Sequence, residues 1–430
     1  MKKTVSLSGK KLLLLGGVKP ACEIVNEAKA MGVTVYVTDY LPDSPAKKIA
    51  DESFMVSATD VDGVVALCHE KKVDGIITGY TDSLLPYCQE ICDKLEKPFW
   101  GSAENIRMCV NKCEFKIACE KSGVSVVPWQ IVTKENYLEI IDTVNLPLVV
   151  KPVDNSGSRG VFKCYEREKL EGLIEKSLSF SKVGEVILER AMNPNNEFSV
   201  YYIMNHGQCF LSGMGDRIVQ IIDPEIAPVG QGMIFPSRHL ENWIHQMDKP
   251  IRRFFRENQM NDGFVFVQGF VENDQFFIHE IGYRLNGGFS YKLVEHFSKY
   301  NQVQQLVLFS LSGDMEMSEI EKSNPAFHGV GMIVTASLKQ GKIGFVSGVD
   351  EIRKMRGVLQ FYQLHTVGDE LLSHGTTAQV FAYILCAVEN RTQMGELLDA
   401  IRDKLVVRDV RWNQMLNVMA DSKRIGMENA

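Results

Sequence analysis

The sequence has no run of apolar residues long enough to cross a membrane, which takes about 18 such residues. A short run near the start, Leu12 to Leu15, follows four lysines but stops at Gly16. A secretory signal needs about 7–15 apolar residues, so we expect a first buried strand there instead. Basic charge is not clustered either, and the formal net charge is -7. These absences predict a cytoplasmic protein that binds neither membrane nor nucleic acid.

The ten cysteines lack the spacing of a disulfide framework. Cys88 and Cys92 are four residues apart, as are Cys109 and Cys113, but neither pair has a second pair to complete a zinc site. We therefore expect reduced thiols. The hydrophobic fraction of 45% is typical of a globular protein, and 430 residues are enough for two or three units.

The first hundred residues alternate between strand and helix patterns. We expect strands at residues 11–15, 33–37 and 73–78, and helices at residues 20–31, 61–71 and 83–95. This alternation predicts a parallel sheet, with ligands at the carboxyl ends of its strands. Gly16-Gly17 lacks the spaced third glycine of a dinucleotide fingerprint, so it favours a tight turn over cofactor binding.

From about residue 105 the pattern becomes that of an α+β region. A helix is expected at residues 107–121, antiparallel strands follow, and the tail is expected to hold short strands and a helix at residues 379–388. The fold class predicted is thus α/β for the first part and α+β for the rest.

The most informative local segment runs from Leu148 to Val161. A strand delivers Lys151, then a loop of glycine and serine, then a second strand. Glycines let backbone N–H groups approach phosphate oxygens, and a lysine supplies a point charge for a phosphate. The segment is not a P-loop, because no Gly-Lys-Ser/Thr occurs and no helix follows. Taken alone, it is equally compatible with a plain hairpin.

Other segments stand in a fixed order around this loop: Asn111-Lys112 before it, Val186 to Met192 and Glu197 after it, and Glu280-x-Gly282-x-Arg284 later still. In this order the chain resembles the ATP-grasp superfamily from about residue 105 to residue 300, and it looks most like carboxylate–amine (L-amino-acid) ligases and biotin-carboxylase-like enzymes. The resemblance implies a pre-ATP-grasp domain (1–105), an ATP-grasp domain with a small lobe (106–185) and a large lobe (186–310), and a C-terminal lobe (311–430).

The resemblance also implies the roles of individual residues. Lys112 and Lys151 would contact ATP phosphates, Glu280 would hold Mg²⁺ or Mn²⁺, and Arg284 would steady the transferring phosphoryl group. The phosphate lid would be Ser156, Gly157, Ser158 and Gly160; the adenine hinge Glu189, Arg190, Ala191 and Met192; the ribose ligand Glu197; and the substrate contacts Arg217, Arg238, Arg284, Gly287 and Gly288. Arginines such as Arg217 and Arg238 are more often structural ion-pair partners than ligands.

Two positions depart from the family pattern. Gln268 stands where a first metal carboxylate is usual, and Gly282 replaces the metal-binding asparagine. Both changes weaken the case for two metal ions, although Glu272 or Asn286 could replace the missing metal ligands. His279 directly precedes Glu280 on a strand, so strict alternation predicts that it points to the opposite face, as a core or surface residue rather than a base.

The function expected is that of an ATP-dependent carboxylate–amine ligase, which forms an amide through an acylphosphate and releases ADP and phosphate. One alternative is activation of bicarbonate, as in carboxylases or carbamoyl-phosphate-forming enzymes. Another is an ATP-binding regulator without turnover, motivated by Gln268 and Gly282. The partners implied are small carboxylates and amines, and a homodimer is compatible with the resemblance.

Overall fold

The computed structural model describes residues 7–155, 159–221, 228–372 and 377–426. Its first part is a four-stranded parallel sheet of order β3-β2-β1-β4. The strands and their helices are β1 (Lys11–Leu15), α1 (Ala21–Ala30), β2 (Thr34–Thr38), β3 (Glu52–Phe54), α2 (Val61–Lys71), β4 (Gly75–Thr78) and α3 (Leu85–Lys94). The predicted α/β start is confirmed, because buried strands alternate with amphipathic helices.

The predicted helix at residues 107–121 is wrong as a single element. Two helices occupy the region, α4 (Ala103–Val110) and α5 (Lys112–Lys121). Asn111 separates them with extended backbone, and its side chain accepts hydrogen bonds from the Cys113 and Glu114 amides. An asparagine cap of this kind starts a new helix, and it makes Lys112 the first residue of α5.

The second sheet is small and antiparallel, with strand order β5-β8-β6-β7. It is formed by β5 (Trp129–Thr133), β6 (Leu148–Pro152), β7 (Phe162–Cys164) and β8 (Glu185–Arg190), with α6 (Tyr137–Ile141) and α7 (Arg167–Leu178) packed on it. Because β8 pairs with β5 and β6, the small lobe continues to residue 190, and the predicted lobe boundary at residue 186 falls inside it.

The large sheet has eight strands in the order β13-β12-β9-β10-β11-β14-β18-β16. Five come from the predicted large lobe: β9 (Glu197–Asn205), β10 (Gln208–Gln220), β11 (Val229–Phe235), β12 (Gly263–Glu272) and β13 (Gln275–Gly282). Three come from the tail: β14 (Val330–Ser337), β16 (Val358–Gln363) and β18 (Val380–Val388). Pairing of β11 with β14 carries the sheet across the predicted boundary at residue 310.

Helices cover these sheets and join the parts of the chain. They are α8 (Leu240–Gln246), α9 (Asp248–Glu257), α10 (Ser290–Ser298), α11 (Gln302–Ser312), α12 (Val349–Arg353), α13 (Arg391–Lys404) and α14 (Ser422–Gly426). Helix α11 packs against α1 and β4, so it lies beside the N-terminal sheet although it is far away in sequence. No helix in the described ranges is long and apolar enough to cross a bilayer.

The predicted helix at residues 379–388 is wrong, because most of these residues form strand β18. This strand lies between β14 and β16 and is buried along most of its length. A short apolar run without alternation fits a buried strand as well as a helix, and here the β-branched and aromatic residues favour the strand. The C-terminal lobe also carries a three-stranded sheet of β15 (Gly341–Ser347), β17 (Glu370–Leu371) and β19 (Val406–Asp409).

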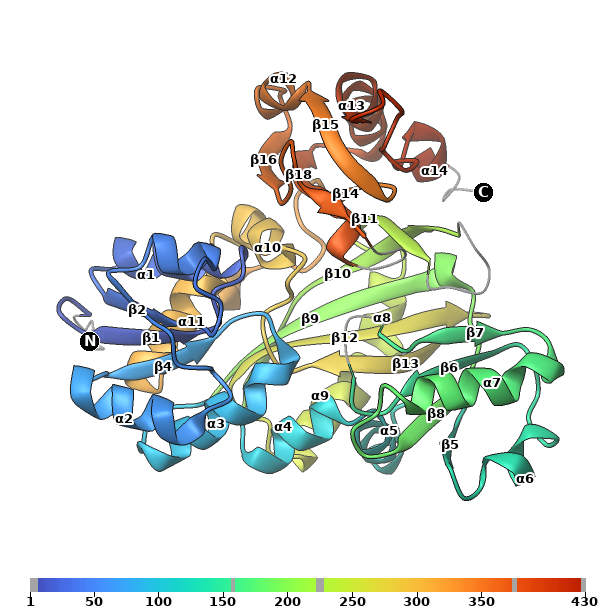
Figure 1. Cartoon of the computed structure of the whole chain (residues 1–430), viewed down its shortest axis with the longest axis horizontal. Helices are drawn as coiled ribbons and strands as arrows, with labels where there is room; N and C mark the ends of the chain where they lie inside the picture. The colour runs from blue at the N-terminus through green and yellow to red at the C-terminus, as the bar shows by residue number, and fades with distance from the viewer. Residues whose placement is uncertain (1–6, 156–158, 222–227, 373–376, 427–430) are drawn as a thin grey trace.

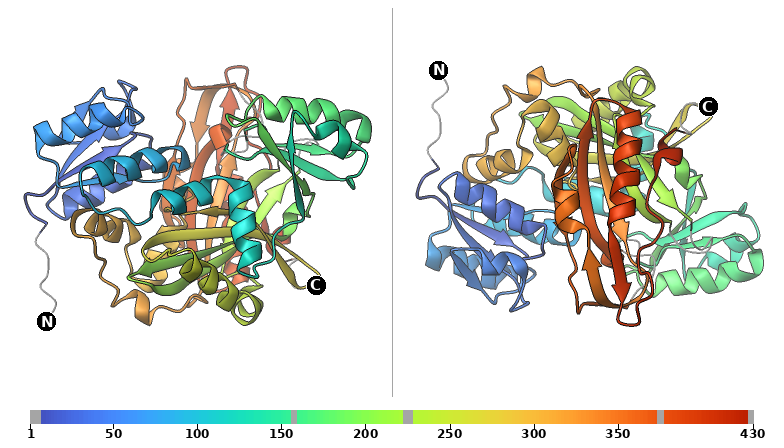
Figure 2. Two further views of the ribbon diagram at one scale, coloured as in Figure 1. Left: turned by 90° about the horizontal axis from the view of Figure 1, so that it is seen from below. Right: turned by 90° about the horizontal axis from the view of Figure 1, so that it is seen from above.

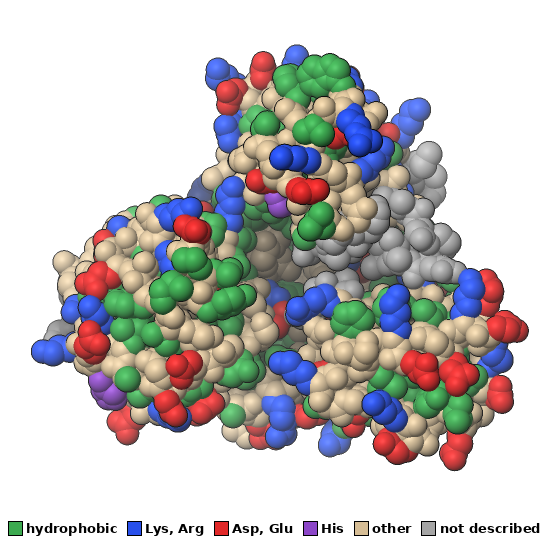
Figure 3. Space-filling model, viewed as in Figure 1, with side chains coloured by type: hydrophobic (Ala, Val, Ile, Leu, Met, Phe, Trp, Pro, Cys, Tyr) green, Lys and Arg blue, Asp and Glu red, His purple; other side chains and the backbone are tan. Residues whose placement is uncertain are grey.

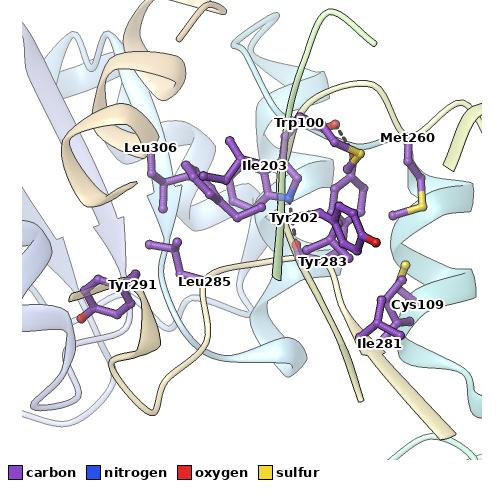
Figure 4. Close-up of a cluster of buried hydrophobic side chains, with 14 of the residues drawn as sticks. Trp100, Cys109, Tyr202, Ile203, Met260, Ile281, Tyr283, Leu285, Tyr291 and Leu306 are labelled. Carbon is purple, nitrogen blue, oxygen red and sulfur yellow. Dashed lines mark hydrogen bonds between the residues drawn. The ribbon is translucent and has the colours of Figure 1, made fainter. Parts of the chain in front are cut away.

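One hydrophobic core joins the N-terminal part to the large sheet (Figure 4). At its centre the indole of Trp100 donates a 2.9 Å hydrogen bond to the Tyr283 carbonyl, and the Tyr283 hydroxyl donates a 2.8 Å hydrogen bond to the Trp100 carbonyl. The views from below and above show the N-terminal sheet, the small lobe and the C-terminal lobe as three masses around the large sheet (Figure 2).

Candidate active site

A cleft of about 620 Å³ opens where the three masses meet, and the space-filling view shows the surface hollowed between them (Figure 3). This volume is in the range typical of small-molecule sites. The walls come from every part of the chain: the loops after β1 and β4, the strands β6 and β8, the strands β9, β10, β12 and β13 of the large sheet, and Leu364 and Tyr383 of the C-terminal lobe. Most of the residues predicted from the sequence lie along it.

The Glu189 carboxylate, which lines the cleft, forms ion pairs with two lysines. Lys151 on β6 lies 2.8 Å from one carboxylate oxygen of Glu189, and Lys116 on α5 lies 3.0 Å from the other. All three side chains are buried. Burial alone would raise the pKa of Glu189, but the two ammonium groups lower it to about 2. The carboxylate is therefore ionised, and its charge keeps Lys151 turned into the cleft.

Lys112 also lines the cleft, at the start of α5. Its ammonium donates a hydrogen bond to the Asn155 carbonyl, at the entry of the predicted phosphate lid. Burial lowers the pKa of this lysine. Ser156, Gly157 and Ser158 lie outside the described residues, whereas Gly160 has a left-handed backbone with a φ of +75° and packs between Pro152 and Phe180.

The predicted adenine hinge follows β8. Met192 is buried and lines the cleft, together with Arg190. The Arg190 guanidinium forms a 2.8 Å ion pair with Glu272, and the Ala191 amide donates to the Pro147 carbonyl. These contacts fix the backbone of the hinge. The same ion pair engages Glu272, the substitute metal ligand that the sequence left open, and Glu272 is not among the residues that line the cleft.

Glu197 and Arg217 face one another on β9 and β10. The guanidinium of Arg217 donates a 2.7 Å hydrogen bond to the Glu197 carboxylate, and both side chains line the cleft. Burial opposes ionisation of Glu197, but the charge of Arg217 brings the pKa of the carboxyl group to about 2. In return, Glu197 raises the pKa of Arg217. Arg217 is thus both an ion-pair partner and a wall of the cleft.

Glu280 and Gln268 lie directly opposite each other on β13 and β12, and both line the cleft. The Glu280 carboxylate makes no hydrogen bond or ion pair to another described side chain, and the Gln268 side-chain amide donates to the Ser199 hydroxyl at 3.0 Å. A carboxylate beside an amide oxygen fits one magnesium ion, which prefers oxygen ligands. In the described part of the chain no group of three His, Cys, Asp or Glu side chains stands ready for a metal.

His279 does not point away from Glu280, and this corrects the expectation from alternation. The β12–β13 register passes from Gln268–Glu280 to Gly269–Ile278, which leaves His279 as the extra residue of a bulge. Its ring therefore lines the cleft beside Glu280, packs against Phe270 with 5.0 Å between the ring centroids, and lies 3.8 Å from the Glu197 carboxylate.

Arg284 follows β13 and meets the N-terminal domain. Its guanidinium forms a bidentate ion pair with the Asp82 carboxylate, in which Nε of Arg284 lies 2.6 Å from Oδ1 of Asp82. Arg284, Asp82, Gly287 and Gly288 all line the cleft, and the Asn286 amide oxygen accepts a 2.7 Å hydrogen bond from the Gly288 amide. The arginine is positioned between the large sheet and the carboxyl end of β4.

Arg238 does not line this cleft. Its guanidinium contacts His239 and Asn196, and its backbone amide donates to Asp216. The alternative interpretation from the sequence, a structural role, describes its surroundings better. Conversely, sequence reasoning missed Asp82 as the partner of Arg284, and it missed Lys116. Lys116 could have been predicted, because residues four apart on a helix share a face and Lys112 was already a candidate.

Comparisons with known proteins agree with this architecture. Residues 118–221 match the family described as D-ala D-ala ligase C-terminus. A formate-dependent phosphoribosylglycinamide formyltransferase from Maridesulfovibrio salexigens is 27% identical over 207 residues, which are 46% of this chain and 52% of the relative. The match thus spans about half the length of that relative.

Solved structures resemble the chain over nearly its whole length. An L-amino acid ligase from Bacillus licheniformis superposes with a TM-score of 0.79 at 18% identity, covering 94% of this chain and 99% of the other. The biotin carboxylase domain of a 2-oxoglutarate carboxylase from Hydrogenobacter thermophilus, in complex with MgADP, ADP and bicarbonate, gives 0.76 at 15% identity, covering 95% and 91%. The chain therefore has the ATP-grasp fold predicted from its sequence, and it resembles ligases of that superfamily.

Proposed function

We propose that the chain is an ATP-dependent carboxylate–amine ligase. The observation that carries the proposal is the set of charged side chains that line one cleft: Lys112 and Lys151, Glu189, and Glu280 with Arg284. Phosphoryl transfer is mainly a matter of positioning and charge neutralisation, and these cations, together with a carboxylate for a metal ion, suit a triphosphate bound in the cleft.

In this proposal each residue has a definite task. Lys112 and Lys151 bind phosphate oxygens, and the hinge around Met192 receives the adenine. Glu197 accepts hydrogen bonds from the ribose, because its ionised carboxylate has two acceptor oxygens for a diol. Glu280 and Gln268 would hold a magnesium ion, which neutralises phosphate charge when it is bound.

The chemistry then proceeds in two steps. An oxygen of the substrate carboxylate attacks the γ-phosphorus of ATP, and the bond to the β-phosphate oxygen breaks, giving an acylphosphate and ADP. The amine attacks the acyl carbon, phosphate leaves, and the nitrogen loses a proton. Arg284 stands where it can neutralise the transferring phosphoryl group once Asp82 releases part of its guanidinium. No covalent enzyme nucleophile is needed.

The test is acid-dependent ADP formation with hydroxylamine as a general trapping amine. The purified chain is incubated with ATP, Mg²⁺ and pools of small carboxylic acids that include formate and L-amino acids. A ligase forms a hydroxamate and ADP in equal amounts with at least one acid. ADP formation that no acid stimulates would sink the proposal.

Activation of bicarbonate is the second candidate, and the resemblance to a biotin carboxylase domain solved with bicarbonate favours including it. Bicarbonate is therefore one member of the acid panel. ADP formation stimulated by bicarbonate but by no organic acid would select this candidate. ATP binding without ADP formation under any condition would instead select the non-catalytic regulator.

A further inference from the structure

A second cavity, of about 330 Å³, lies at the carboxyl edge of the N-terminal sheet. Its walls are the ends of β1 and β4 and the loops that follow β1, β2, β3 and β4. In the strand order β3-β2-β1-β4 the chain turns in opposite directions on the two sides of β1, so the cavity lies at the switch point where open parallel sheets bind ligands.

The lining of this cavity is almost entirely uncharged. Its apolar members include Leu15, Val18, Leu41 and Leu84. Among the described residues the one charged member is Asp39, and both of its carboxylate oxygens are engaged, one by the Gly17 amide at 2.7 Å and the other by the Leu41 amide at 2.9 Å. No lysine or arginine of the described ranges lines the cavity, so a phosphate or carboxylate group would meet no counter-charge from them.

Lys47 lies close by but does not supply that charge. Its ammonium is buried and donates to the backbone carbonyls of Asp39 and Leu41, the second at 2.8 Å. A cation saturated by carbonyls in this way belongs to the scaffold of the β2 loop rather than to a ligand site.

One polar atom in the cavity wall has no partner. The Thr78 side chain, at the end of β4, is 1% exposed, and its hydroxyl makes no hydrogen bond to another described residue. A buried hydroxyl left unpaired costs about 1–3 kcal/mol. A ligand with one polar group among apolar atoms would satisfy it.

The cavity adjoins the cleft described above. Val18, Tyr80 and Thr81 line both spaces, and the next residue, Asp82, forms an ion pair with Arg284. A molecule that fills the cavity is therefore held against the same loop that positions Arg284.

We propose that this cavity binds the body of the amine substrate, and that this body is uncharged and largely apolar with one polar contact to Thr78. The inference rests on the proposed ligase function and adds the class of amine to it. An uncharged amine would distinguish this chain from a relative such as the phosphoribosylglycinamide formyltransferase, whose name specifies a phosphorylated amine.

Binding can be measured without turnover. The full chain with ADP and Mg²⁺ is titrated by calorimetry with L-leucinamide and, separately, with O-phosphoethanolamine. We expect leucinamide to bind at least tenfold more tightly. Equal affinities, or tighter binding of the phosphorylated amine, would overturn the inference.

Substitutions at two cavity positions, with a control outside the cavity, locate the bound amine. T78V keeps the shape of the side chain but removes its hydroxyl, and we expect a rise of about three- to tenfold in the leucinamide Kd, while T78S retains wild-type affinity. L84A enlarges the cavity and shifts preference toward L-phenylalaninamide. L138A, an exposed leucine on α6, is the matched control and changes neither affinity. Wild-type affinity in both T78V and L84A would place the amine elsewhere.

The outcome is separable from that of the ligase proposal. Hydroxamate formation without leucinamide binding rejects the cavity assignment and keeps the ligase. Leucinamide binding that depends on Thr78, without hydroxamate formation from any acid, rejects the ligase and keeps the cavity as a binding site.

Discussion

Arg284 is the residue on which phosphoryl transfer depends in our proposal. We expect R284Q to lower kcat/KM by about 10²–10³, because one preorganised charge at the transferring group is lost. The Kd for ATP should stay within about threefold of wild type, since Arg284 forms its ion pair with Asp82, while Lys112 and Lys151 remain to bind the phosphates. Steady-state assays and nucleotide titration measure the two quantities.

R238Q is the matched control for that substitution. Arg238 resembled Arg284 as a candidate in the sequence, but its guanidinium contacts His239 and Asn196 outside the cleft. Activity within about twofold of wild type is expected. A loss in R238Q as large as in R284Q would contradict the assignment of the cleft.

Gln268 limits the metal site to one carboxylate. We expect Q268E to lower the Mg²⁺ concentration for half-maximal activity, or for Mg²⁺-dependent ADP binding, by about tenfold, because it adds a second anionic ligand opposite Glu280. E272Q is the control. Glu272 lies in the same sheet but forms an ion pair with Arg190, so the Mg²⁺ dependence of E272Q should match that of the wild type. An unchanged Mg²⁺ requirement in Q268E would mean that the metal does not contact this position.

At the scale of elements, much of the fold was readable from local patterns. The strand at residues 11–15 and the helix at residues 61–71 occur as predicted, because their periodicities match their surroundings. The helix predicted at residues 379–388 failed, since a buried strand without alternation has no distinguishing period. The predicted orientation of His279 was wrong for a different reason. A bulge depends on the pairing of two strands, and the sequence of one strand does not specify it.

The small lobe offers a test of local packing beside the phosphate loop. Gly160 and Gly184 both have a φ of +75°, but a Cβ at Gly160 would lie 2.8 Å from Phe180, whereas a Cβ at Gly184 meets nothing within 4 Å. We expect G184A to destabilise the fold by about 1 kcal/mol through backbone strain alone. G160A should cost about 2–4 kcal/mol, because overpacking adds to the strain. Denaturant unfolding measures both, and equal losses would contradict the packing.

At the scale of the whole molecule, the cleft is assembled from parts that are distant in the sequence. The order of motifs predicted the lysines, the acidic residues and Arg284, all of which line one cleft, although their roles stay predictions. Asp82 was not recognisable as the partner of Arg284, because 202 residues separate them and no local pattern links the pair. The cavity proposed for the amine was not predictable from local patterns either, since it is formed by the loops after four strands.

Acid should loosen the contacts between α5 and the small sheet. The pKa of Glu189 is lowered to about 2 from 4.5, so its ion pairs with Lys116 and Lys151 stabilise the fold fully above pH 4.5 and are lost as the pH falls toward 2. E189Q lacks this titration. The difference in thermal midpoint between wild type and E189Q should therefore shrink over that range, and a constant difference would contradict the pairing.

The central claim is that the γ-phosphoryl group of ATP passes to a carboxylate. The direct measurement uses an acid that supports hydroxamate formation, labelled with ¹⁸O in its carboxyl group, and mass spectrometry of the phosphate released during amide formation. The account predicts one ¹⁸O atom in each phosphate, carried over when the acylphosphate breaks at its acyl carbon. Phosphate without ¹⁸O, formed alongside ADP, would show transfer to water and contradict it.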